Sequence, residues 1–189
     1  AAYYANIETI DRQFEDILKT LREAGQDLND WIIIYTSDHG EMLGEHAIWE
    51  KQRFFEGSAK VPLFIRYPKR FSPKTISKNV NLIDLFATLC ELTETEVPEG
   101  LDSRSLIPLL EGDTSNWENE TISQFNGQNL MIKRDSIKYQ WYSEDQSEVL
   151  FDLGIDASEN ENLINHPRYQ EMLPMFRSRR DELGFAPRR

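Results

Sequence analysis

Apolar side chains near the start of the sequence recur every three to four residues, which is the spacing of an α-helix with one buried face. This spacing runs through residues 3–22, and Gly25 follows as a stop signal for a helix. A continuous apolar and β-branched run comes next, at residues 31–36. Uninterrupted runs of this kind are typical of strands buried on both faces of a parallel sheet. We therefore expect a helix followed by a buried strand.

A long polar and aromatic segment, residues 37–60, separates that strand from a second apolar run at residues 61–66. Loops of this length without a periodic pattern are more often functional than idle. Pro62 stands near the start of the second run, which favours an edge or first-residue position in a strand. Residues 80–92 predict another helix, and Gly112 with the polar segment after it indicates a boundary between subdomains.

The pattern changes beyond that boundary, where short strand-like runs are separated by turn-forming or polar residues and predict an antiparallel meander. The runs are residues 121–125, 130–133, 137–142 and 149–152. Apolar positions in residues 167–183 fall on roughly one face of a helix that could cover one side of this sheet. We expect an α/β chain with a sheet-and-helix core over residues 1–115 and a small antiparallel subdomain over residues 116–189.

The charge balance limits what this chain can bind. Its 189 residues carry 33 Asp and Glu against 21 Lys and Arg, which gives a formal net charge of −12. Such a surface repels phosphate backbones and anionic lipids, so nucleic acid and membranes are poor candidates for a partner. The sequence contains no apolar run of about 18 residues that would span a membrane. An anionic substrate would need concentrated positive charge at its site, from a metal ion or a lysine.

The segment after the first predicted strand carries the best candidates for chemistry. Asp38 and His39 follow that strand directly, and ligands of α/β proteins bind outside the carboxyl ends of strands. Asp offers a hard anionic oxygen and His a neutral nitrogen, so the pair can bind one divalent cation if Gly40 lets the backbone turn sharply. The alternative is a turn with an N-cap, which an Asp-His-Gly sequence forms more often than a metal site.

Two further side chains of this segment could contact an anionic ester. Lys51 would supply a point charge and a proton donor at the far end of the loop. His46 is the weaker candidate, because a histidine beside Gly44 and Trp49 can simply be a hydrogen-bonded loop residue. Three acidic side chains of the same segment are most simply a solvated face. These are Glu41, Glu45 and Glu50.

The order of short motifs along residues 35–66 resembles the C-terminal signature of the sulfatase family. The motifs are Thr-Ser-Asp-His-Gly, Leu-Gly-Glu-His, Trp-Glu-Lys, Phe-Phe-Glu-Gly and Lys-Val-Pro-Leu-Phe-Ile-Arg. The resemblance extends to Tyr-Tyr-Ala at residues 3–5 and Leu-Phe-Asp-Leu at residues 150–153, so nearly the whole chain is covered. It implies the C-terminal part of an alkaline-phosphatase-like sheet-and-helix core, followed by the small antiparallel β-sheet subdomain with its helix.

The resemblance also implies roles for the candidate residues. Asp38 and His39 would be ligands of a divalent cation, usually calcium. Many sulfatases have Asn at the position of His39, and the histidine of this chain also admits a softer metal such as manganese. Lys51 would contact the sulfate ester, and Lys51 or His46 would hold the sulfate or assist the leaving alcohol. Lys60 would have no catalytic role. The implied function is metal-dependent hydrolysis of small sulfuric esters, as in choline-sulfatase-like and iduronate-sulfatase-like members.

The chain departs from the family pattern at the nucleophile. Sulfatases use a formylglycine made from Cys or Ser in a Cys/Ser-x-Pro/Ala-x-Arg motif, whereas Cys90 is followed by Glu-Leu-Thr-Glu and no such motif occurs. The paired aspartates that complete the family's metal shell are missing too. We expect a C-terminal fragment that is inactive alone and self-associates through an exposed sheet edge. A phosphodiesterase or phosphonate monoester hydrolase of the same superfamily, and a catalytically silent binding module, stay open as alternatives.

Overall fold

The computed structural model describes residues 2–51 and 53–186, which fold into two compact units. The first unit is the chain through Thr36 together with Pro62–Pro73, and the second is Ser37–Val61 together with the chain from Lys74 onward. The units interleave along the sequence, because the segment between the two strands of the first unit belongs to the second. The division into domains at residues 1–115 and 116–189 stays a prediction.

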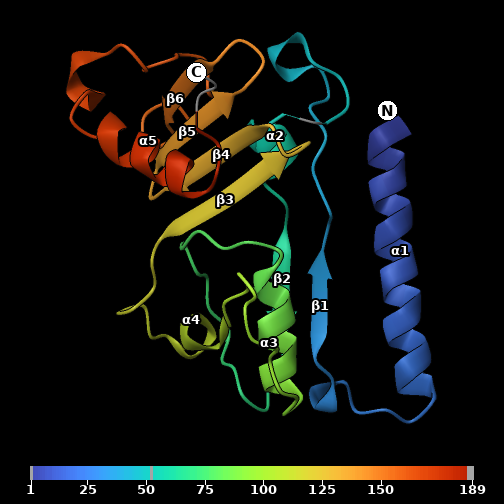
Figure 1. The fold of residues 1–189 in the computed structure, drawn as a ribbon. Coiled ribbons are helices and arrows are strands. Elements are labelled where there is room, and N and C mark those ends of the chain that lie inside the picture. Colours follow the sequence, from blue (N-terminus) through green and yellow to red (C-terminus); the bar gives the residue numbers. More distant parts are fainter. Residues whose placement is uncertain (1, 52, 187–189) are drawn as a thin grey trace. The chain divides into compact units, whose positions relative to one another are not determined.

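The first unit consists of a long helix beside a two-stranded sheet (Figure 1). Helix α1 spans Ala2–Glu23 and confirms the helix predicted from the apolar spacing. A short 3-10 helix at Leu28–Asp30 leads from α1 into the sheet. Strand β1, Ile33–Thr36, pairs with strand β2, Leu63–Arg66, so both predicted strands are present with slightly shorter bounds.

The pairing of β1 differs from the parallel, doubly buried strand that its apolar run predicts. Its strand neighbour among the described residues, β2, is antiparallel, and no side chain of β1 is fully buried. A parallel pair needs a crossover connection, usually a helix, whereas an antiparallel pair can be joined by a loop that turns back. The described part of residues 37–62 contains no helix longer than α2, Glu56–Ala59, and therefore suits the antiparallel pairing.

The second unit is built on a four-stranded antiparallel sheet in the order β3-β4-β5-β6, which confirms the predicted meander (Figure 1). The strands are β3 at Glu120–Phe125, β4 at Asn129–Arg134, β5 at Ile137–Tyr142 and β6 at Ser147–Asp152. Tight turns join them, and Asp135 between β4 and β5 adopts the left-handed conformation with φ 52°. Asp tolerates that conformation better than most residues do.

One face of this sheet carries the main hydrophobic core, covered by helix α5, Leu173–Glu182. The predicted helix over residues 167–183 is divided into α5 and a 3-10 turn at Pro167–Tyr169. Proline is tolerated only in the first turn of a helix, so Pro174 suits a helix that begins at Leu173. The buried cluster comprises Leu130, Ile132, Tyr139, Trp141, Leu150, Leu163, Tyr169, Leu173 and Phe176.

The two-residue period of a strand determines which side chains lie on the opposite face of the sheet. Because Tyr139 and Trp141 face the core, Lys138 and Gln140 between them face the other way, and both are almost completely buried. Helix α2 lies on this second face, where Lys138 bonds Glu56. The segment between β1 and β2 is therefore attached to the meander.

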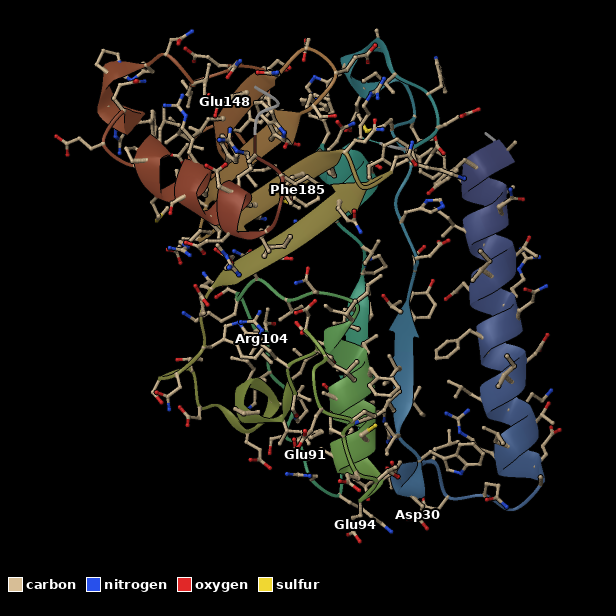
Figure 2. The ribbon with its side chains drawn as sticks, in the orientation of Figure 1. Asp30, Glu91, Glu94, Arg104, Glu148 and Phe185 are labelled. Atoms are coloured by element: carbon tan, nitrogen blue, oxygen red, sulfur yellow. The ribbon has the colours of Figure 1, made fainter. Side chains whose placement is uncertain are left out.

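Two helices complete the second unit. Helix α3, Asp84–Leu92, is the later part of the helix predicted at residues 80–92, and α4 spans Ile107–Glu111. The fully buried carboxylate of Asp84 accepts hydrogen bonds from the backbone of Asn81 and of Arg104, which ties α3 to the segment before α4. Arg104 is labelled in Figure 2. None of the helices in the described residues combines the length and apolar character that crossing a bilayer requires.

Candidate functional site

Asp38 and His39 lie in the turn after β1, and their side chains point at one another. Oδ2 of Asp38 is 3.4 Å from Nε2 of His39, while Oδ1 accepts a hydrogen bond from the His39 backbone N–H at 2.9 Å. That backbone hydrogen bond is the main reason that the pKa of Asp38 lies below its usual value. The Asp38 side chain is 83% exposed and that of His39 39%, so the pair is open to solvent.

The ring of His39 is oriented by its other nitrogen. Nδ1 lies 2.8 Å from the carbonyl oxygen of Gly40. A carbonyl oxygen only accepts, so Nδ1 is the donor, and in the neutral imidazole Nε2 then carries the lone pair. The carbonyl oxygen of His39 itself accepts from the hydroxyl of Ser37 at 2.9 Å. In this neutral form, an electron-pair donor of His39 faces a carboxylate oxygen of Asp38.

This donor set fits two neighbouring positions on a divalent cation. Two ligands at right angles, with bonds of about 2.0–2.4 Å, stand roughly 2.8–3.4 Å apart, and the two facing atoms are 3.4 Å apart. Metal-binding histidines almost always donate their other N–H to a carbonyl or carboxylate, as His39 does to Gly40. Within residues 2–51 and 53–186, no three or more His, Cys, Asp and Glu side chains gather as a metal site. Further ligands would have to come from elsewhere.

Two glycines bring the turn and helix α2 unusually close together. The backbone N–H of Gly40 donates to the carbonyl of Ser58 at 2.8 Å. A Cβ atom on Gly40 would lie 2.0 Å from the carbonyl oxygen of Gly57, which no side chain permits. Position 40 therefore requires glycine for this close approach, and the turn that carries Asp38 and His39 is fixed to α2.

The middle of the segment closes on itself before Lys51. The backbone N–H of the fully buried Met42 donates to the carbonyl of Glu50 at 2.8 Å, and a carboxylate oxygen of Glu41 accepts from the N–H of Glu50 at 2.6 Å. Of the three acidic side chains predicted to form a solvated face, Glu45 and Glu50 are exposed, whereas Glu41 is half-buried and its carboxylate binds the backbone of the loop. Lys51 follows this closure with an exposed side chain.

His46 is placed by an aromatic contact. Its backbone adopts the left-handed conformation, with φ 52°, and its ring stacks on Phe55 at 4.0 Å with an angle of 15° between the planes. The ring of Phe55 in turn lies 5.9 Å from that of Phe151 on β6. Among the residues that the structure describes, neither His46 nor Lys51 forms a hydrogen bond or ion pair with Asp38 or His39. The four candidates share one segment, and the structure joins two of them directly.

A buried charged cluster below this segment escaped the sequence analysis. Lys138 on β5 is fully buried and binds Glu56 at 2.6 Å and Glu159 at 2.7 Å. Each of these side chains reads as an ordinary surface charge in isolation. The signal that could have revealed Lys138 is its place beside Gln140 in strict alternation with the core residues of β5, which indicates a sheet with something covering both faces.

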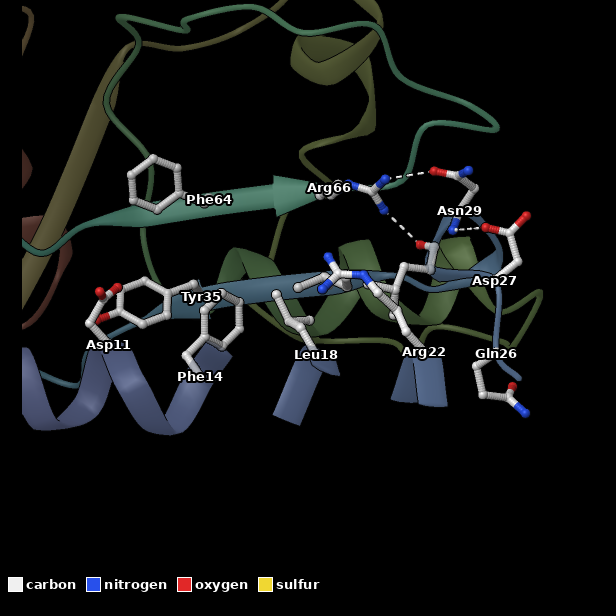
Figure 3. A pocket seen from close by; sticks show the side chains of 12 residues that line it. Asp11, Phe14, Leu18, Arg22, Gln26, Asp27, Asn29, Tyr35, Phe64 and Arg66 are labelled. Atoms are coloured by element: carbon white, nitrogen blue, oxygen red, sulfur yellow. Dashed lines mark hydrogen bonds between the residues drawn. The ribbon is translucent and has the colours of Figure 1, made fainter. Parts of the chain in front are cut away.

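A separate cavity of about 760 Å³ lies in the first unit, between α1 and the two strands (Figure 3). Phe14, Tyr35 and Phe64 provide aromatic surface there. At one end the guanidinium of Arg66 donates to the Leu28 carbonyl at 2.6 Å, which ties β2 to the connection after α1. None of the four predicted site residues lines this cavity.

The fold defines the class of protein: the C-terminal part of an alkaline-phosphatase-like sheet-and-helix core with a small antiparallel subdomain. The structure superposes on a solved protein in complex with its substrate D-glucosamine-2-N,6-O-disulfate with a TM-score of 0.85 and 25% identity, over 94% of this chain and 38% of that one. It superposes on the phosphonate monoester hydrolase of Agrobacterium radiobacter with a TM-score of 0.82 and 27% identity, over 94% and 39% of the two chains.

The sequence comparisons then identify the family. The model of the family described as Sulfatase matches residues 1–95, and this chain belongs to that family. It is 34% identical over 186 residues to an arylsulfatase of Clostridium perfringens and 36% identical over 188 residues to a choline-sulfatase of Rhizobium meliloti. These matches cover 94% and 95% of this chain. The chain spans only 38% and 36% of the length of the two relatives.

Proposed function

We propose that this chain is the C-terminal part of a longer, metal-dependent enzyme that hydrolyses small sulfuric esters. The matched family region contains Asp38, His39, His46 and Lys51, so all four candidate residues lie in the part of the chain that the Sulfatase family model matches. Relatives named as sulfatases are more than twice as long as this sequence. The nucleophile, a formylglycine by resemblance, and the remaining metal ligands would be supplied by sequence outside these residues.

The pair of donors at Asp38 and His39 is the observation that carries this proposal. A carboxylate oxygen and an imidazole nitrogen face one another at 3.4 Å, and the second nitrogen of the ring is held by a carbonyl. Calcium prefers oxygen ligands and flexible geometry, while an imidazole nitrogen also suits manganese. We therefore propose calcium as the ion that Asp38 and His39 hold, with manganese as the alternative.

Each candidate residue has a distinct task in such a site. A bound cation would neutralise charge on the sulfate oxygens and activate the nucleophile. Asp38 and His39 would hold that cation, and the hydrogen bond to Gly40 would keep the lone pair of Nε2 directed at it. The exposed ammonium of Lys51 would bind the sulfate oxygens, which a protein of net charge −12 must attract through local positive charge. His46 would assist the leaving alcohol as a proton donor.

The test is an assay of the longer protein against sulfate esters, with Lys51→Ala as the first variant. Removing a preorganised charge from the reacting group typically costs about 10²–10³ in kcat, and we expect a loss of this size. Lys60→Ala is the matched control, because Lys60 is an exposed lysine of the same segment without a proposed role. Equal activity of the Lys51 variant and the wild type would overturn the role of Lys51.

Hydrolysis of phosphonate or phosphate esters is the second candidate function. The superposition on a phosphonate monoester hydrolase, with 27% identity and a TM-score of 0.82, favours it. Sulfate and phosphonate esters are both tetrahedral anions, so the same cation and Lys51 could bind either one. Comparing kcat/KM for an aryl sulfate and an aryl phosphonate in one preparation decides between the two. Absence of turnover with both, in a protein that contains the formylglycine motif, would favour a silent binding module.

The 189-residue chain by itself should neither hydrolyse esters nor hold calcium firmly. Calcium takes six to eight oxygen ligands, and Asp38 with His39 provides two donors. We expect no turnover of an aryl sulfate by the purified chain and only weak heats of calcium binding in calorimetry. Tight, stoichiometric calcium binding that disappears in Asp38→Asn would show that this chain completes the metal shell without further sequence.

A further inference from the structure

Lys138 is a completely buried lysine whose ammonium has a full set of partners. Nζ lies 2.6 Å from a carboxylate oxygen of Glu56, 2.7 Å from one of Glu159 and 2.8 Å from the carbonyl oxygen of Phe54. These three acceptors use the three N–H groups of the ammonium. Two of the acceptors, Phe54 and Glu56, belong to the segment that carries the candidate site, and they are 84 and 82 residues away in sequence (138 minus 54, 138 minus 56).

The charges in this cluster balance. Lys133 lies 3.4 Å from the second carboxylate oxygen of Glu56, so two lysines oppose two glutamates. Burial raises the pKa of Glu56, but the nearby ammonium groups of Lys138 and Lys133 outweigh it and leave that pKa below its usual value. Burying such a group of charges contributes little net stability, because each charge loses its hydration. What the cluster does provide is a single geometry for the segments that it joins.

Glu159 fixes the same segment a second time. Its other carboxylate oxygen accepts a hydrogen bond from the backbone N–H of Glu56 at 2.6 Å, at the start of α2. Its own backbone is in the left-handed conformation, with φ 56°, which is unfavourable for a residue other than glycine. Strained backbone of this kind persists where the surrounding contacts require it and is concentrated at functional sites.

The contacts continue from this cluster to the candidate metal ligands. Helix α2 begins at Glu56, and its Ser58 accepts the N–H of Gly40 while Gly57 packs against the same glycine. The carbonyl of Gly40 orients the ring of His39. In the other direction, Lys51 stands three residues before Phe54 (54 minus 51). Gly40 at one end of the candidate site thus contacts the two residues that follow Glu56, and Lys51 at the other end lies three residues before Phe54. Lys138 or Glu159 binds both Glu56 and Phe54.

We propose that Lys138 and Glu159 are positioning residues, which from the sheet face opposite α5 hold the segment carrying the metal ligands and the candidate anion contact. This inference rests on the proposed function, which assigns metal binding to Asp38 and His39 and sulfate binding to Lys51. The small antiparallel sheet would then be a platform for the site in addition to a folding unit.

Hydrogen exchange of backbone amides in this chain tests the proposal without any need for activity. In Lys138→Met and in Glu159→Gln, which keeps the size of the side chain, the amides of Gly40 and Met42 should exchange about tenfold faster than in the wild type. The amides of Ile132 and Leu150 in the sheet should change less than about threefold. Lys138→Arg, which keeps the charge, should restore part of the protection at Gly40.

Glu120→Gln is the matched control. Glu120 is a buried carboxylate of the same sheet, but it binds Arg134 at 2.6 Å and Arg179 at 3.0 Å, on the side of α5. This variant should leave the exchange of Gly40 and Met42 unchanged. The proposal is overturned if Lys138→Met and Glu159→Gln leave those two amides protected, or if they accelerate all amides equally. Should Lys138→Met fail to fold, Glu159→Gln decides.

Kinetics of the longer protein separate this inference from the proposed function. With an active wild type, Glu159→Gln should lower kcat/KM by about tenfold, the kinetic counterpart of a small displacement of the site, while Glu120→Gln should retain it. A wild type without esterase activity would overturn the proposed function, and the exchange data would still decide whether Lys138 and Glu159 fix the segment. Unchanged kcat/KM in Glu159→Gln would overturn the positioning role.

Discussion

Gly40 shows how one residue can set the backbone path of the segment that carries the candidate site. The turn after β1 approaches α2 so closely that any side chain at position 40 would meet the backbone of Gly57. Glycine is commonly understood as a source of flexibility, but here its lack of a Cβ permits contact and therefore order. This contact fixes the backbone of the turn that carries Asp38 and His39.

Gly40→Ala should therefore destabilise the second unit. A Cβ atom 2.0 Å from the Gly57 carbonyl forces the backbone to move, and such overpacking typically costs about 1–3 kcal/mol. Gly57→Ala is the control, because its Cβ would first meet the mobile end of the Glu45 side chain at 3.0 Å. Urea unfolding followed by tryptophan fluorescence measures both. A larger loss for Gly57→Ala than for Gly40→Ala would contradict this account.

Glu148 makes stability depend on pH. Burial raises its pKa, but hydrogen bonds from Arg177 and Tyr139 outweigh this and leave the pKa below the ordinary value of 4.5. Glu148 itself is labelled in Figure 2. A carboxylate with a lowered pKa stabilises the folded state above its unfolded-state pKa, and this stabilisation is lost as the pH falls through the folded-state pKa. The free energy of unfolding should therefore decrease as the pH falls below about 4.5.

The variant Glu148→Gln isolates this contribution. At pH 7 it should lower the free energy of unfolding by about 1.5–3 kcal/mol, since it replaces hydrogen bonds to a charged group. The difference from the wild type should shrink toward zero as the pH falls and Glu148 becomes protonated in both states. Glu144→Gln, at an exposed site of the same region, serves as the control. Parallel curves for Glu148→Gln and the wild type across the acid range would contradict the prediction.

At the scale of elements, helix α5 and the meander depend on one another. The ring of Phe176 stacks on that of Tyr139 at 5.5 Å and is 1% exposed. Truncation of a buried phenylalanine typically costs about 3–5 kcal/mol, and we expect this loss for Phe176→Ala in urea unfolding. The neighbouring Met175 is 38% exposed, so Met175→Ala should cost about 1 kcal/mol or less. Similar losses for both variants would mean that α5 is only loosely attached to the sheet.

Local periodicity was enough to predict most elements. The helix of residues 3–22, the four strands of the meander and the covering role of the last helix all follow from spacings that are complete within a few residues. Neither the pairing direction nor the burial of β1 followed, because an apolar run specifies neither the direction of the neighbouring strand nor what covers its two faces. The division of the last helix follows from Pro174, because proline fits the first turn of a helix and not its interior.

The candidate site was predictable as a segment but not as a geometry. Asp38 and His39 could be proposed from their place after a strand. The hydrogen bond from His39 to Gly40 and the stacking of His46 on Phe55 can be recognised only in the three-dimensional structure. Lys138 could not be connected with the site at all, because the contact joins segments more than eighty residues apart. Long-range ion pairs leave no local pattern in a sequence.

At the scale of the whole molecule, the described residues include exposed apolar side chains on the long helix α1. Helix α1 has no buried residue, and its exposed apolar side chains include Ile7, Ile10 and Ile17. Exposed apolar side chains on one helix favour association. In the part of the chain that the structure describes, β1 and β2 form a sheet of two strands, and a strand edge without a further neighbour adds to this tendency. We predict that this chain self-associates at high concentration, which sedimentation velocity would detect.

The apolar stripe of α1 should drive this association. Ile10→Lys should weaken it about tenfold or more, since burying one isoleucine is worth about 1.5–3 kcal/mol. Thr9→Lys adds the same charge outside the stripe and should have little effect. A folded, monodisperse monomer at high concentration would contradict the prediction and would mean that the first unit is stable without any further cover.

The hydrogen bond between Glu56 and Glu159 joins residues 103 positions apart, and during synthesis this sequence separation becomes a delay. A ribosome adds about 5–20 residues per second, so the segment with the candidate metal ligands leaves the ribosome roughly 5–20 s before Glu159 can bind it. During this interval the segment has been made, but the Glu159 side chain that binds its backbone has not. The segment thus gains this support only after about a hundred further residues have been made. A nascent chain arrested before Glu159 should leave the segment open to protease, whereas one arrested well after Glu159 should not.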